Sequence, residues 1–154
     1  MSYNLLFVCT GNTCRSPMAE ALARYALAER GLEGVEVASA GTSAWEGAPA
    51  SDEVPLVLAE IDVELGEHAS SPLTPEAVAW ADRILVMSVR HRMAVEAMGG
   101  GDKVALVTEY LDGEDANQPV MDPIGAGVET YRSTRDQLRR AVQGLVDHLE
   151  SSDL

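Results

Sequence analysis

Short apolar runs alternate with longer stretches of helical periodicity along the chain. Continuous apolar runs at 5–8, 84–87 and 104–107 fit buried strands, and the alternating segment at 35–38 fits another. Strands separated by helices predict a parallel sheet with helices on both faces. We therefore expect an α/β fold, a single doubly wound domain over residues 1–154 with a four-stranded parallel sheet. Ligands in such sheets bind beyond the carboxyl ends of the strands, where the strand order reverses.

Apolar residues that recur every three or four positions predict the helices between these strands. The first helix begins near Pro17 and stops at Gly31. Ser51 is placed to cap a second helix, and Thr74 followed by Pro75 is placed to cap a short third one. Two more helices are predicted at 89–98 and 128–149.

The chain is strongly acidic, with 25 Asp and Glu against 11 Lys and Arg and a formal charge of −14. This balance excludes broad nucleic-acid binding and argues against docking on anionic membranes. It still permits an anionic ligand, because a single site can be locally positive. No apolar run approaches the roughly 20 residues of a membrane span, and the first residues lack the basic segment of a signal peptide. With two cysteines five positions apart, a reducing cytoplasm is the expected location.

The segment from Leu5 to Met18 predicts a strand, a tight polar loop and a helix. Its loop is Cys9-Thr10-Gly11-Asn12-Thr13-Cys14-Arg15-Ser16. The backbone N–H groups of the loop and of the helix N-terminus can face one small volume and bind a phosphate there. Gly11 and Asn12 tolerate the positive φ that such a loop needs. A Walker phosphate loop is excluded because Gly-Lys-Ser/Thr is missing, and a zinc site lacks a matching Cys/His pair.

Cys9 is placed at the mouth of this anion site. A thiolate there would be stabilised by the helix dipole and by Arg15, whose guanidinium can hold two phosphoryl oxygens. Ser16 can hydrogen-bond the thiolate and make it a better leaving group. The Cys-x5-Arg spacing is therefore typical of phosphoryl transfer through a covalent cysteine.

The loop resembles the signature of the low-molecular-weight protein tyrosine phosphatase family. The resemblance continues, in chain order, at Ser39-Ala40-Gly41-Thr42, His68, 84–87 and Asp122-Pro123. It implies that Cys9 and Arg15 are catalytic, and that residues matching Asn12, Ser39 and His68 form a hydrogen-bond network that supports the loop.

Asp122 is ambiguous without this resemblance. An isolated Asp-Pro is better explained as an exposed turn. However, the loop after the fourth strand can share the carboxyl edge of the sheet with Cys9. The resemblance implies that Asp122 is the general acid and base, in a loop that Pro123 stiffens.

Departures from the tyrosine-phosphatase pattern indicate the substrate. Thr13 stands where those enzymes usually carry a bulky aliphatic residue, and Ile124-Gly125-Ala126 where they often carry aromatics. The loop and the segment 131–136 resemble the protein-arginine-phosphatase branch. A threonine hydroxyl can bond the guanidinium of phosphoarginine, where an alkyl group would leave those donors unpaired. We therefore favour phosphoarginine in proteins, with phosphotyrosine as the alternative. Trp45 has two possible roles. If it forms a wall of the substrate cleft, it favours phosphotyrosine; the alternative is that it packs on the surface and contacts no substrate.

The same residues are compatible with other roles. Arsenate reductases of this fold share a similar loop but need further cysteines to relay electrons, and none follows Cys14. An anion-sensing module would need neither nucleophile nor acid, so the presence of both Cys9 and Asp122 argues against it.

Cys14 is either a redox guard that pairs with Cys9 or a small buried hydrophobe. His91 and His148 are assigned no role, and Trp80 is expected in the core. No cofactor or metal is expected; the expected partners are phosphorylated proteins as substrates, with inorganic phosphate as the product.

Overall fold

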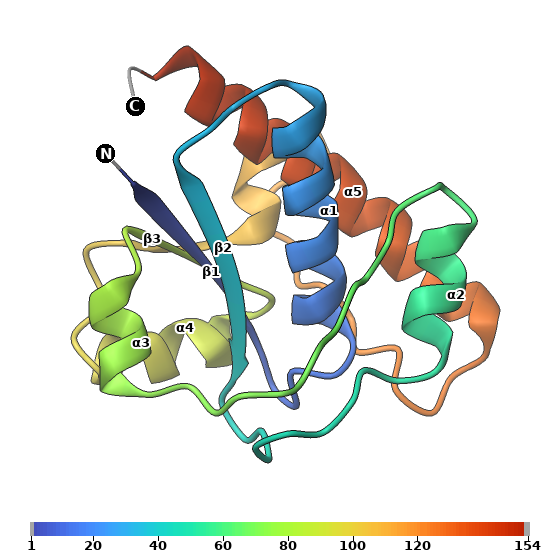
Figure 1. Cartoon of the computed structure of the whole chain (residues 1–154). Helices are drawn as coiled ribbons and strands as arrows, with labels where there is room; N and C mark the ends of the chain where they lie inside the picture. Colours follow the sequence, from blue (N-terminus) through green and yellow to red (C-terminus); the bar gives the residue numbers. More distant parts are fainter. Residues whose placement is uncertain (1, 153–154) are drawn as a thin grey trace.

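A parallel sheet forms the centre of the computed structural model, which describes residues 2–152 (Figure 1). Within those residues its four strands are β1 (Tyr3–Cys9), β2 (Val35–Gly41), β3 (Arg83–Val86) and β4 (Val104–Leu106). All neighbours are parallel, in the order β2-β1-β3-β4. The chain places β2 on one side of β1 and β3 on the other, so the strand order reverses between β1 and β3. The carboxyl ends of these two strands are therefore where a ligand should bind.

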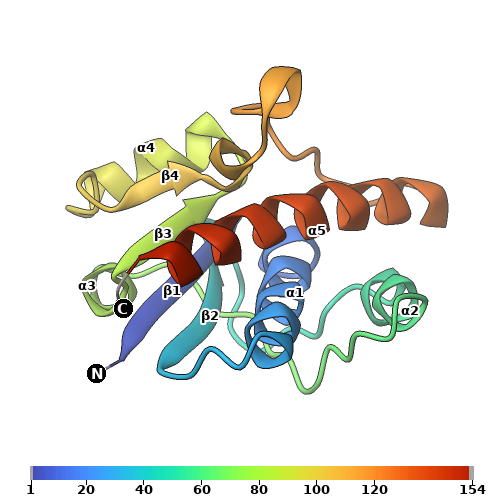
Figure 2. The same ribbon diagram turned by 90° about the horizontal axis from the view of Figure 1, so that it is seen from above.

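Helices cover both faces of the sheet, as Figure 2 shows. On one face lie α1 (Arg15–Glu29) and α5 (Val128–Ser151), with α2 (Glu53–Ala59) packed against α5. On the other face lie α3 (Pro75–Trp80) and α4 (Val89–Ala97). The predicted α/β fold, with a four-stranded parallel sheet between helices, is confirmed. None of the helices within residues 2–152 is both long and apolar enough to cross a membrane.

The burial of β1 explains why this strand is apolar throughout. Leu5 and Phe7 face the core formed with α1 and α5, whereas Leu6 and Val8 face the core formed with α3 and α4. All four side chains are at most 2% exposed. A central strand of a parallel sheet is buried on both faces, so its sequence is a continuous apolar run rather than an alternating one.

Local sequence signals set several element boundaries. Thr74 caps α3 as predicted, with its Oγ1 accepting a hydrogen bond from Ala77 N at 3.1 Å. Gly31, at a φ of 64°, follows the end of α1. The fourth strand ends one residue earlier than predicted, because the backbone turns there into the 3-10 helices η1 (Val107–Tyr110) and η2 (Gly113–Asp115).

Two predictions about single side chains are wrong. Ser51 does not cap α2 with its hydroxyl; the helix begins at Glu53, and Ser51 Oγ lies 3.0 Å from Cys14 Sγ instead. Trp80 is not in the core but 37% exposed, because α3 is short and buries Val78 against the sheet.

Candidate active site

The loop between β1 and α1 lies where the strand order reverses. Cys9 is the last residue of β1, and α1 begins at Arg15. Asn12 makes the turn by adopting a φ of 57°, whereas Gly11, for which a positive φ was also expected, does not adopt one. The first N–H groups of a helix have no partner within it, so the start of α1 and the loop can offer donors to an anion.

The Cys9 sulfur is buried and lies 2.9 Å from Ser16 Oγ. Asn12 Nδ2 donates a hydrogen bond to the same oxygen at 2.7 Å. Because Ser16 Oγ accepts from Asn12, its own hydrogen is free to point at the sulfur. A hydrogen bond in that direction stabilises a thiolate.

Asn12 connects the loop to distant segments. Its Nδ2 donates to Ser39 Oγ at 2.9 Å, and its Oδ1 accepts from Ser71 N at 2.9 Å. His68 Nε2 lies 2.7 Å from the Asn12 carbonyl oxygen and is the donor, because a carbonyl only accepts. The structure thus brings together Asn12, Ser39 and His68, and their hydrogen bonds hold Asn12 in a conformation that is costly for a residue with a side chain.

The end of β2 packs directly against the backbone of the loop. Thr42 N donates a hydrogen bond to Cys9 O at 2.9 Å. A Cβ atom added to Gly41 would overlap the Thr10 carbonyl oxygen and lie 2.9 Å from the backbone N of Asn12. The loop can therefore keep its conformation only if residue 41 has no side chain.

Arg15 is 6% exposed, and its guanidinium is held at two of its nitrogens. Nη1 donates to the Val120 carbonyl at 2.9 Å, and Nη2 donates to Thr10 Oγ1 at 3.3 Å. Nε, also buried, has no hydrogen-bond partner among residues 2–152. A buried donor left unpaired costs on the order of 1–3 kcal/mol, and more if it is charged. An anion that bonded to Nε would remove this cost.

Asp122 and Pro123 lie in the loop before α5, which reaches the same edge of the sheet. Asp122 Oδ2 lies 3.7 Å from Arg15 Nη2, and Oδ1 accepts from Ile124 N at 3.1 Å. The Asp122 side chain is 41% exposed and so remains accessible to a substrate and to water. A cavity of about 530 Å³ opens beside the carboxylate, with walls that include Thr10, Arg15, His91 and Asp122.

Thr13 and Cys14 follow Asn12 in the loop, and neither lines the cavity beside Arg15. The Thr13 hydroxyl is half-buried and makes a weak contact, 3.9 Å long, with Cys14 Sγ. Cys14 is buried, unpaired with any other cysteine, and lies 3.0 Å from Ser51 Oγ and 3.5 Å from Tyr131 Oη. Burial and the contact with Cys14 raise the pKa of Tyr131 to about 12, so its hydroxyl stays protonated.

Trp45 lies on the loop between β2 and α2 and is 85% exposed. Ser70 Oγ donates a hydrogen bond to its backbone carbonyl, which fixes the main chain and leaves the indole free. The indole is not part of the wall of the cavity beside Arg15. Its role in substrate selection stays a prediction.

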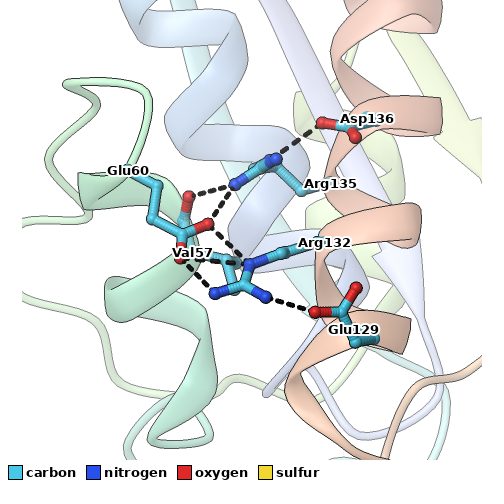
Figure 3. A network of polar contacts seen from close by, with 6 residues as sticks. All are labelled: Val57, Glu60, Glu129, Arg132, Arg135 and Asp136. Atoms are coloured by element: carbon cyan, nitrogen blue, oxygen red, sulfur yellow. Dashed lines mark hydrogen bonds and ion pairs between the residues drawn. The ribbon is translucent and has the colours of Figure 1, made fainter.

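A network of arginines and carboxylates joins α2 to α5 (Figure 3). Glu60, directly after α2, accepts from Arg132 Nη2 and Arg135 Nη1, both at 2.7 Å. Arg135 also donates to the Val57 carbonyl at 2.8 Å. Hydrogen bonds from Arg132 and Arg135 lower the pKa of Glu60 to about 2. In this chain, therefore, the arginines of the segment 131–136 hold the C-terminal end of α2 against α5.

His91, to which the sequence pattern assigned no role, contacts the loop. It is 2% exposed, and its Nε2 lies 2.9 Å from Thr10 Oγ1. The strand order could have predicted this contact. Because β3 is the neighbour of β1, the residues directly after the two strands lie side by side. His148, by contrast, lies in the last turn of α5 against the ring of Tyr110.

A parallel α/β fold with a Cys-x5-Arg anion loop, and an acid at the same sheet edge, defines a class of cysteine-dependent phosphatases. The family model described as "Low molecular weight phosphotyrosine protein phosphatase" matches residues 4–153. The chain belongs to this family and is a phosphatase, which confirms the resemblance inferred from the loop.

Relatives match over nearly the whole chain. It is 42% identical over 153 residues to a protein-arginine-phosphatase of Geobacillus stearothermophilus, covering 98% of this chain and 99% of the relative. It is 40% identical over 149 residues to a protein-arginine-phosphatase of Bacillus subtilis (strain 168), covering 96% and 97%. A solved structure of a cysteine-to-serine mutant of the YwlE arginine phosphatase, with a phosphorylated active site serine, gives a TM-score of 0.87 at 38% identity and 97% coverage of each chain.

Proposed function

We propose that this phosphatase removes the phosphoryl group from phosphoarginine in proteins, through a phosphorylated Cys9. The observation that carries the choice of substrate is the Thr13 hydroxyl, which makes only a weak 3.9 Å contact among the described residues. Thr13 lies in the same loop whose other groups are those needed to bind phosphate. The names of the two bacterial relatives support the same substrate.

In the first step the Cys9 thiolate attacks phosphorus, so that a sulfur–phosphorus bond forms and the phosphorus–nitrogen bond breaks. The loop N–H groups and Arg15 Nε and Nη2 bind the phosphoryl oxygens as charge shifts onto them. The carboxyl group of Asp122 donates a proton to the departing arginine nitrogen.

In the second step water attacks the phosphocysteine. Asp122, now a carboxylate, takes a proton from this water, and the sulfur–phosphorus bond breaks to release inorganic phosphate. Ser16 Oγ, 2.9 Å from the sulfur, stabilises Cys9 as it leaves as a thiolate. Asn12, Ser39 and His68 do not touch the reacting atoms; they hold the loop in shape.

Thr13 distinguishes the substrate by the hydrogen bond it offers. A guanidinium carries several N–H donors that must find acceptors when they leave water. The Thr13 hydroxyl supplies one acceptor, and Asp122, once it has given up its proton, offsets the charge of the guanidinium that leaves. Ile124 and Gly125, next to Asp122, supply no aromatic surface for a tyrosine ring.

Phosphotyrosine is the second candidate substrate. The observation in its favour is Trp45, whose indole is 85% exposed on the loop after β2 and is free to pack against a ring.

Two peptides that differ only in the phosphorylated residue, phosphoarginine in one and phosphotyrosine in the other, test the substrate. We expect kcat/KM to be about ten- to a hundredfold higher for phosphoarginine, the scale of one polar contact. A higher value for phosphotyrosine would overturn the assignment and leave the phosphatase mechanism intact.

Variants of Cys9 and Arg15 test the mechanism. Cys9→Ser should lose turnover of para-nitrophenyl phosphate yet still bind inorganic phosphate, because the loop and Arg15 remain. Arg15→Lys should lose both, since an ammonium group cannot replace the two parallel hydrogen bonds of a guanidinium. Turnover by Cys9→Ser at the wild-type rate would exclude the phosphocysteine.

A further inference from the structure

His91 reaches the phosphate loop from the opposite face of the sheet. It lies in the first turn of α4, which directly follows β3 and packs against it (Figure 2). Since β3 is the neighbour of β1, the start of α4 lies beside the loop that follows Cys9. The imidazole is 2% exposed, so it is part of the interior rather than of the surface.

Both ring nitrogens of His91 have hydroxyl partners. Nδ1 lies 3.1 Å from Ser88 Oγ, and Nε2 lies 2.9 Å from Thr10 Oγ1. Burial, together with the charges of Arg15 and Arg90, lowers the pKa of His91 to about 4, against an opposing effect of Asp122. The ring is therefore neutral near pH 7, with one donor and one acceptor nitrogen to match two hydroxyl groups.

The Thr10 hydroxyl, which His91 holds in place, contacts Arg15 in turn. Although residue Thr10 is exposed, its hydroxyl accepts a hydrogen bond from Arg15 Nη2 at 3.3 Å. The guanidinium has one other hydrogen bond, from Nη1 to the Val120 carbonyl, whereas Asp122 lies farther away, at 3.7 Å from Nη2. The two hydrogen bonds set the direction in which Nε points. If Thr10 were free to rotate, one of the two would be lost.

We propose that His91 is a positioning residue, which through the Thr10 hydroxyl holds Arg15 in the orientation that presents Nε and Nη2 to a phosphoryl group. This role of His91 rests on the proposed function only because it takes phosphate as the ligand of the loop. It does not depend on whether the substrate is phosphoarginine. His91 does not touch the reacting atoms. Its removal should weaken the binding of phosphate without removing the nucleophile or the acid.

A double-mutant cycle on His91 and Thr10 tests this coupling. His91→Phe keeps a ring but removes both hydrogen bonds, and Thr10→Val removes the hydroxyl at constant shape. Each should raise the inhibition constant of inorganic phosphate against para-nitrophenyl phosphate roughly three- to tenfold, the effect of one hydrogen bond. The double variant should bind phosphate no more weakly than Thr10→Val alone, because His91 acts through that hydroxyl. Independent, multiplying effects would overturn the proposal, as would an unchanged constant in His91→Phe.

Two further variants separate positioning from packing. Val95→Ala, one turn further along α4 and fully buried, should lower the melting temperature while leaving the phosphate constant unchanged. His91→Gln, whose amide can reach the position of Nε2, should recover most of the phosphate affinity that His91→Phe loses.

If His91→Phe does not fold, His91→Gln, Thr10→Ser and Thr10→Val are compared in its place. Thr10→Ser keeps the hydroxyl, so weak phosphate binding by this variant would contradict the proposal. Wild-type protein that binds phosphate but has no turnover would instead count against the proposed function.

Discussion

The carboxylate of Asp122 lies 3.7 Å from Nη2 of Arg15, whose own Nε has no partner among the described residues. A phosphoryl group bound to the guanidinium would leave the carboxyl group free to exchange a proton with the leaving nitrogen. Asp122→Asn should therefore lower kcat on a phosphoarginine peptide by about 10²–10⁴. The loss should be much smaller on para-nitrophenyl phosphate, because its leaving group hardly needs a proton.

The comparison between the two substrates is what identifies an acid. Equal losses on both would assign Asp122 a structural role in its loop. Met121→Ala is a suitable control, since its side chain is 70% exposed directly beside Asp122 and should keep both rates.

Thr13→Ile should change which substrate the enzyme prefers. Without the hydroxyl, a guanidinium donor is left unpaired, which lowers kcat/KM on the phosphoarginine peptide by about ten- to a hundredfold. The rate on phosphotyrosine should rise, because an alkyl group packs against an aromatic ring. Thr13→Ser keeps the hydroxyl and should retain the wild-type preference. Unchanged kinetics in Thr13→Ile would remove Thr13 from substrate selection.

Trp45→Ala tests the aromatic surface independently. If the exposed indole packs against a substrate ring, its removal should lower kcat/KM on the phosphotyrosine peptide more than on the phosphoarginine peptide, by a few fold. Losses of the same size on both peptides would mean that Trp45 acts on the loop rather than on the ring.

Cys14 should decide whether oxidation of the enzyme is reversible. Peroxide converts the Cys9 thiolate to a sulfenic acid, and attack by the Cys14 thiol would form a disulfide and release water. To do so, Cys14 must turn away from Ser51 and Tyr131, its neighbours at 3.0 and 3.5 Å. Without Cys14, further peroxide oxidises the sulfenic acid to a sulfinic acid, which a thiol cannot reduce. After peroxide, a thiol reductant should therefore restore wild-type activity but not that of Cys14→Ser.

A matched variant isolates the thiol from its surroundings. Tyr131→Phe removes a neighbour of Cys14 but not the sulfur, and its activity should recover as well as that of the wild type. Equal recovery in Cys14→Ser would show that Cys14 is only a small buried side chain.

Glu60→Gln should destabilise the fold in a pH-dependent way. The folded-state pKa of Glu60, about 2, lies below the ordinary value of 4.5, so the folded state favours the carboxylate. Its contribution to stability is fully present above about pH 4.5 and is lost as the pH falls toward 2. The gap between wild type and Glu60→Gln in denaturant midpoint should therefore be large at pH 7 and small at pH 2.5.

Glu129→Gln provides the comparison for this prediction. Glu129 also pairs with Arg132, but its side chain is 85% exposed and its ion pair should contribute little. A gap for Glu60→Gln that does not shrink at low pH would show that its carboxylate charge is not what stabilises the contact between α2 and α5.

The fold was predictable because its signals are local. Leu5 to Val8 form an unbroken apolar run because that strand is buried on both faces, and Thr74 caps its helix through a bond three residues away. Trp80 was misplaced because hydrophobicity alone does not say how much of a side chain a short helix can cover. Ser51 was misplaced because its hydroxyl has a tertiary partner in place of a local one.

The site was predictable only where its residues are close in sequence or covered by the family resemblance. Cys9, Asn12, Arg15 and Ser16 lie close together in the sequence, from the end of β1 to the first turn of α1, and their spacing already indicates an anion site. His91 is 81 residues from Thr10, and no spacing rule connects the two. Their contact depends on β3 lying next to β1, which follows from the strand order and not from either segment alone.

Gly41 shows how far the demands of such a loop extend. It takes no part in any proposed chemical step, yet the backbone of Thr10 and Asn12 approaches so closely that even a methyl group would collide. In a library of all single substitutions, position 41 should accept one amino acid, as strictly as a nucleophile does. Loss of activity on substitution of Gly41 would show that the loop backbone leaves no room for a side chain. Without the structure, the same substitution data would suggest that Gly41 is a catalytic residue.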